Sequence, residues 1–148
     1  MKIQEKIDNE IQDAMRAKNV DKLAALRAVK SAIMLEATKN RITQVSDKVS
    51  LKLIARLVKQ RKDSSAIFIE QNRQDLANDE ISQLAYLEEY LPDQMDEQEV
   101  KQNIQEVILE CGASSLADMG RCMAVLMNRL NGKVDGSLVS RLLREELS

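Results

Sequence analysis

Basic residues at helical spacing are the side chains of this sequence best suited to bind a ligand. Arg56, Lys59 and Lys62 follow one another at intervals of three, and Lys52 precedes them by one helical turn. A straight basic ridge of this kind suits the phosphate backbone of a nucleic acid. The spacing therefore predicts that Lys52, Arg56, Lys59 and Lys62 bind RNA.

A second basic group lies near the end of the chain, around a turn that contains two glycines. Its members are Arg129, Lys133, Arg141 and Arg144, and the turn spans residues 132–136. The free amides in the first turn of the helix that follows favour anions. We therefore expect a backbone phosphate beside Lys133, and these four residues complete the predicted RNA-binding set.

The remaining reactive side chains form no convincing catalytic constellation. The chain has no His, which excludes a Ser-His-Asp triad, a Cys-His pair and a His-ligated zinc site. Glu88, Glu89 and Asp93 fit a solvated acidic linker better than an acid–base pair. Ser114 and Ser115 fit a helix cap. We expect no catalytic residue, no metal, no cofactor and no enzyme activity from the chain alone.

Cys111 and Cys122 are the two cysteines of the chain. Without His they do not complete a zinc site, and structural disulfides are rare in cytoplasmic proteins. The favoured interpretation is two small buried hydrophobic residues. The cytoplasm is the expected compartment, because the first residues lack the apolar stretch of a signal peptide and no apolar run reaches membrane-spanning length.

Charge is distributed unevenly along the chain, although the net charge is only -2. Residues 16–62 include 13 basic and 3 acidic side chains, whereas residues 63–110 include 13 acidic and 2 basic ones. Such asymmetry points to a nucleic-acid partner. An equally open alternative is that the two segments pair with each other in the fold.

The composition predicts an all-α protein. Gly occurs 4 times and Pro once among 148 residues, and the 44% of hydrophobic residues is enough for a core. Apolar residues at helical spacing predict helices over residues 2–17, 21–40, 47–72 and 79–90. Asp21 is expected to cap the second of these helices, and residues 73–78 to form a bend.

Pro92 marks the predicted boundary between two subdomains. The residue before a proline is pushed out of the helical region, so the fourth helix should end there. Capping boxes at residues 96–99 and 115–118 predict two further helices, and residues 137–147 predict the last. The architecture is therefore about seven helices, with an N-terminal helical subdomain over 1–92 and a compact three-helix tail over 93–148.

Several separate segments resemble the YqeY family, in order and spacing, across essentially the whole chain. They are residues 59–64, 90–95, 112–120 with Met123 and Met127, and 132–139. Proteins of this family are similar to the C-terminal region of GatB, the B subunit of the glutamine-dependent amidotransferase that converts misacylated tRNA. In that region a helical domain precedes a small tail that contacts the outer corner of the tRNA. The resemblance implies the same division near Pro92.

The resemblance implies particular residues only in the tail. The family pattern of an internal Met, a Gly-Lys turn and a Val on the last helix falls on Met127, Gly132, Lys133 and Val139. Two positions depart from the family pattern, since Ala124 stands where Gly is usual and Ser140 where Asn is usual.

The amidotransferase's kinase and transamidase sites lie in parts that this chain does not contain. The resemblance therefore implies a non-catalytic tRNA-binding or accessory module, and a carbon–nitrogen ligase label with glutamine as amido donor would be inherited by homology. The alternative is a protein–protein adaptor that docks on a translation-related enzyme. Neither interpretation requires a membrane or a metal.

Overall fold

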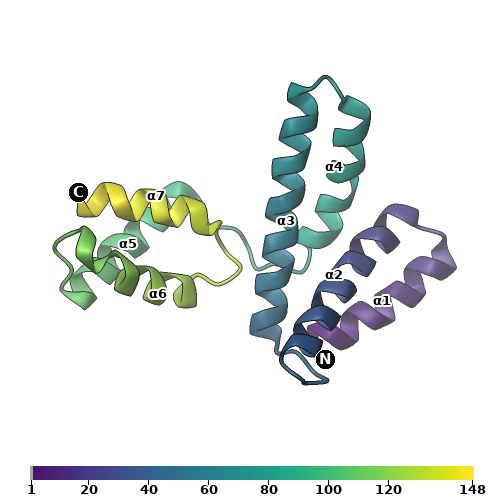
Figure 1. Ribbon diagram of the computed structural model, residues 1–148, viewed down its shortest axis with the longest axis horizontal. Coiled ribbons are helices and arrows are strands. Elements are labelled where there is room, and N and C mark those ends of the chain that lie inside the picture. Colours follow the sequence, from purple (N-terminus) through teal and green to yellow (C-terminus); the bar gives the residue numbers. More distant parts are fainter. Residues whose placement is uncertain (1) are drawn as a thin grey trace. The chain divides into compact units, whose positions relative to one another are not determined.

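The computed structural model describes residues 2–148, which form two compact units. The boundary between them in the sequence falls between Leu91 and Pro92. This part of the chain is helical and contains no strand, which confirms the all-α prediction (Figure 1). The first unit contains α1 (Ile3–Ala17), α2 (Val20–Lys39), α3 (Asp47–Glu70) and α4 (Gln74–Glu88). The second contains α5 (Glu97–Cys111), the short 3₁₀ turn η1 (Leu116–Asp118), α6 (Met119–Arg129) and α7 (Gly136–Leu147).

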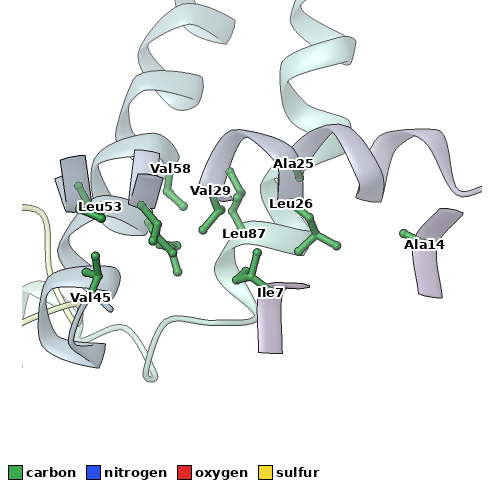
Figure 2. Packing of buried hydrophobic residues seen from close by; sticks show 12 residues of the cluster. Ile7, Ala14, Ala25, Leu26, Val29, Val45, Leu53, Val58 and Leu87 are labelled. Atoms are coloured by element: carbon green, nitrogen blue, oxygen red, sulfur yellow. The ribbon is translucent and has the colours of Figure 1, made fainter. Parts of the chain in front are cut away.

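In the first unit, α2 packs against each of the other three helices, and α3 and α4 pack side by side (Figure 1). The core forms where their apolar faces meet. Ile7 of α1, Leu26 and Val29 of α2 and Leu87 of α4 lie together in it and are almost fully buried (Figure 2). Burial of these side chains is what holds the four helices together, because each large apolar side chain removed from water contributes about 1.5–3 kcal/mol.

The start of α2 differs from the sequence prediction. Asn19, not Asp21, caps this helix, because the Asn19 side chain accepts a hydrogen bond from the amide of Lys22 at 3.2 Å. The Asn19 side-chain amide also donates to the hydroxyl of Tyr86 in α4 at 3.3 Å. Asp21 lies inside the first turn, where its charge still favours the positive end of the helix.

The fourth helix begins five residues earlier than the sequence predicts. The bend covers only residues 71–73, and Asn72 adopts a left-handed conformation with φ of 57°. The segment from Gln74 to Asn78 is helical because it needs to present only one face to the core, and Ala77 on that face is fully buried. At its other end α4 stops at Glu88, and turn hydrogen bonds lead the chain to Pro92.

The prediction of one long third helix is confirmed. α3 has 24 residues, which corresponds to about 36 Å. Its polar middle is stabilised by α4, because the guanidinium of Arg61 donates to the side-chain oxygen of Gln83 at 2.8 and 3.1 Å. Ile54 and Val58 of α3 point into the core, so the opposite face of this helix is left to solvent.

The second unit packs α5, α6 and α7 around a core of its own. Ile104 of α5, Leu126 of α6 and Leu143 of α7 are fully buried there. Asp96 caps α5 by accepting the amide hydrogen of Glu99 at 2.8 Å, and Gly112 ends the helix with the predicted left-handed φ of 63°. The predicted capping box of Ser115 and Asp118 is also present.

The carboxylate of Asp118 makes the stability of the second unit depend on pH. Its carboxylate accepts the amide hydrogens of Ser114 at 2.9 Å and Ser115 at 3.3 Å, and these bonds lower the pKa of that carboxyl. A pKa lowered by folding stabilises the fold above the unfolded value of about 4, and this stability is lost as the pH falls through the folded pKa. We expect the thermal midpoint of the wild type to fall more between pH 7 and pH 2 than that of Asp118→Asn, measured by circular dichroism. Parallel pH profiles would contradict this role.

Candidate nucleic-acid interface

The exposed face of α3 has a continuous row of cations. Lys52 and Arg56 each lie two residues from the buried Ile54, which places them about 160° around the helix from it. Lys59 continues the row by one turn and is also exposed. Neither Lys52 nor Arg56 makes an ion pair within residues 2–148. We refer to Lys52, Arg56 and Lys59 as the α3 ridge.

Lys62 does not belong to this ridge. Its ammonium lies 3.5 Å from a carboxylate oxygen of Glu88 in α4, at the edge where the two helices meet. This pair links the basic segment, residues 16–62, to the acidic segment, residues 63–110. At Lys62, therefore, the two segments pair with each other, as the alternative interpretation of the charge distribution expects. It does not hold at Lys52 and Arg56, which remain exposed without a carboxylate partner in the part of the chain that the structure describes.

Lys48 extends the same face toward the start of α3 and was not among the predicted binding residues. It lies four residues before Lys52, is exposed, and follows the helical spacing of the ridge. Between Lys48 and Lys59 the helix has no acidic residue. The spacing signal that identifies Lys52 therefore also identifies Lys48.

Two of the four predicted tail cations are engaged by carboxylates. Arg129 pairs with Glu106 at 3.3 Å and with Glu110 at 2.6 Å, both on α5. Arg141 lies 3.7 Å from Glu97 of α5 and 3.3 Å from Glu145 of α7. These contacts offset the two guanidinium charges, so Arg129 and Arg141 are weaker phosphate ligands than the sequence alone indicates.

The other two tail cations are available. Lys133 and Arg144 are both exposed, and neither forms an ion pair with any residue from 2 to 148. Arg144 borders a shallow hollow along α7 that Gly136, Ser140 and Glu145 also line. The carboxylate of Glu145 makes this hollow a mixed rather than a purely cationic surface.

The predicted phosphate position at the start of α7 is already filled by a carboxylate. Asp135 is the N-cap of the helix, and its side chain accepts the amide hydrogen of Ser137 at 3.0 Å. A negative side chain at this point satisfies the amide and repels a second anion. A phosphate in the first turn of α7 would have to displace this carboxylate, so phosphate binding there stays a prediction that the Asp135 cap disfavours.

The turn that presents Lys133 is held by the segment after Pro92. The side-chain amide of Gln94 donates to the carbonyl oxygen of Gly132 at 2.8 Å, and the amide of Met95 donates to the carbonyl oxygen of Lys133 at 3.0 Å. These two bonds fix the backbone of the turn while the Lys133 side chain extends into solvent. Their partners lie 38 residues apart along the chain, so helical spacing does not reveal them.

The structure offers no metal cluster and no membrane helix within the residues that it describes. No three His, Cys, Asp or Glu side chains gather there in a way that would hold a metal ion. None of the helices described is both long and apolar enough to span a bilayer.

One protein-family model matches nearly the whole chain, including both units. The family model described as Yqey-like protein matches residues 4–147. The chain belongs to the YqeY-like family. A comparison with curated proteins gives no match. Membership of the YqeY-like family thus rests on a match that includes the α3 ridge as well as the tail.

The tail pattern of this YqeY-like protein is largely structural. Val139 is fully buried in the core of the second unit, and Gly132 has a φ of 78°, in the left-handed region that favours glycine. Met127 is partly buried and packs against the same core. Lys133 is the member of the pattern with an exposed charged side chain, so it is the one best suited to touch a ligand.

Proposed function

We propose that this YqeY-like protein is a non-catalytic tRNA-binding or accessory module, related to the tail of the amidotransferase B subunit. The observation that carries the proposal is the α3 ridge, where two cations without carboxylate partners and a third exposed cation follow one helix face. Phosphate oxygens are the natural partners of such a row, because each lysine or arginine that meets one releases a condensed counterion.

The distribution of charge between the units favours α3 as the main contact. The first unit has 16 basic and 14 acidic residues, whereas the second has 6 basic and 10 acidic. The tail would therefore repel a phosphate chain except near Lys133 and Arg144. Because the whole protein is acidic, with a pI of about 5.3, we expect binding to be local and modest.

Binding of the purified protein to total tRNA over a salt series tests this function. Three phosphate contacts along the ridge predict that log affinity falls with log salt with a slope of about -3. Fluorescence anisotropy with labelled tRNA measures both the affinity and the slope. Absence of saturable binding at low salt would contradict the proposal.

A protein–protein adaptor is the second candidate, and one surface favours it. Leu109 near the end of α5 is 82% exposed, and Leu116 after the connecting loop is 50% exposed. Single exposed apolar side chains are common on protein surfaces, whereas several that lie together mark surfaces that meet another protein, and Leu109 and Leu116 flank the same connection. If tRNA does not bind, a translation-related enzyme that docks on this end of the tail becomes the favoured partner.

A further inference from the structure

The two cysteines of the second unit lie at the same end of one helix pair. Cys111 is the last residue of α5, and Cys122 lies in the first turn of α6. A short connection reverses the chain between them, so α5 and α6 run antiparallel (Figure 1). Both cysteines are therefore close to the same turn, although ten residues separate them in the sequence.

The ion pairs of Arg129 fix the register of these two helices. Arg129 contacts Glu106 and Glu110, so the end of α6 lies beside the second half of α5. Moving back along α6 from Arg129 to Cys122 covers about 10.5 Å, and moving forward along α5 to Cys111 covers about 7.5 Å from Glu106 and about 1.5 Å from Glu110. Both displacements lead toward the turn that joins α5 to α6, where Cys111 packs against the core cluster that contains Cys122.

The two thiols share one apolar environment but differ in exposure. Cys122 is fully buried in the core of the second unit, and Cys111 is partly exposed and packs against that core. Burial raises the pKa of the Cys122 thiol, and the neighbouring Cys111 raises it further. A dissolved oxidant can therefore reach the Cys111 thiol, whereas the Cys122 thiol is not accessible to it.

We propose that Cys111 and Cys122 form a reversible disulfide that links the end of α5 to the start of α6 when the protein meets a peroxide. This inference is independent of tRNA binding. It also differs from the interpretation of the pair as two inert buried hydrophobic residues, because it gives Cys111 the role of the attacking thiol and Cys122 that of the resolving thiol.

The reaction balances in two steps. The thiolate of Cys111 attacks one peroxide oxygen, so that a sulfur–oxygen bond forms, the oxygen–oxygen bond breaks and the leaving hydroxide takes a proton to become water. The Cys122 thiol then gives up its proton and its sulfur attacks the Cys111 sulfur, so that the sulfur–sulfur bond forms, the sulfur–oxygen bond breaks and the leaving hydroxide takes up a proton to become the second water. The two thiols supply the two electrons that reduce the peroxide, and a small-molecule thiol reverses the bond by exchange.

The disulfide would close a loop around Gly112 and the Asp118 cap. Cross-linking removes freedom from the unfolded chain, so the oxidised second unit should melt at a higher temperature than the reduced one. Reversible, redox-sensing disulfides of this kind are the form in which such bonds occur in reducing compartments.

Arg121 allows a direct test, because trypsin cleaves between the two cysteines. Folded protein is treated with hydrogen peroxide, its remaining thiols are alkylated, and it is digested without reduction. We expect the peptides 102–121 and 122–129 to stay joined, with a mass lower by about 2 Da than their sum, and to separate after reduction.

Single variants identify the roles of the two thiols. Cys122→Ala should leave Cys111 to accumulate as sulfenic acid, trapped by a dimedone reagent, whereas Cys111→Ser should leave Cys122 unmodified in the folded protein. Circular dichroism of both variants checks that they fold. If the wild type yields no joined peptide, or if it yields only disulfides between two copies of the chain, the proposal is wrong.

Discussion

Replacing Lys52 and Arg56 with glutamate is expected to lower the affinity for tRNA by at least about tenfold at low salt. The double variant removes two phosphate contacts from the α3 ridge and places two carboxylates on the same helix face. The salt slope should become shallower by about 2, since each lost phosphate contact reduces it by about 1. Anisotropy titrations of wild type and variant over the same salt series measure both effects.

A matched control separates the ridge from the net charge of the protein. Arg16 and Lys30 also lie in the first unit, and both are already paired with carboxylates, Arg16 with Asp13 at 3.5 Å and Lys30 with Asp8 at 3.0 Å. The double change Arg16→Glu and Lys30→Glu alters the net charge by the same amount. It should weaken binding less than the ridge variant does, and equal losses would show that the ridge is not the contact surface.

The largest expected effect on stability comes from Leu126. This side chain is fully buried in α6 and packs among Ile104, Val139 and Leu143. Leu126→Ala removes apolar contact and leaves a cavity, which costs about 2–5 kcal/mol of unfolding free energy. Urea unfolding followed by circular dichroism measures the loss, which we expect in the transition of the second unit.

Leu109→Ala is the control for this measurement, because the same chemical change falls on a side chain that is 82% exposed. Exposed substitutions usually change stability by less than about 0.5 kcal/mol. If Leu126→Ala lowers the unfolding free energy no more than the control does, the stability of the second unit does not depend on the core cluster around Leu126.

Local spacing predicts most of the helices because each one buries a single apolar stripe. The period of Leu51, Ile54 and Val58 is enough to locate α3, and Gly112 is enough to end α5. The start of α4 is harder to predict, since the adjacent Leu76 and Ala77 are the only apolar residues between Gln74 and Glu80 and set no helical period. Asn19 and Asp21 are equally suitable caps by residue type, and the extended backbone at Asn19 decides between them.

The charged sites are less predictable than the helices, because ion pairs join residues that are distant in the sequence. Arg129 lies 23 residues from Glu106, and Arg141 lies 44 residues from Glu97. The i,i+4 spacing on α7 indicates the contact of Arg141 with Glu145, but no local pattern indicates the partners that α5 supplies to Arg129 and Arg141. Lys52 and Arg56 lie on the face of α3 opposite the buried Ile54 and have no such partner among residues 2–148. Their residue types alone do not show this, because it depends on how the helices pack.

The hydrogen bonds from Gln94 and Met95 to the Gly132–Lys133 turn determine where the tail can be cut for reuse. A truncation or fusion that started at Glu97, the first residue of α5, would remove both bonds and leave two carbonyl oxygens of the turn without these donors. The portable piece therefore begins at Pro92. A designer who grafts this tail onto another protein, or a gene fusion that transfers it, must carry the five residues before α5 as part of the module.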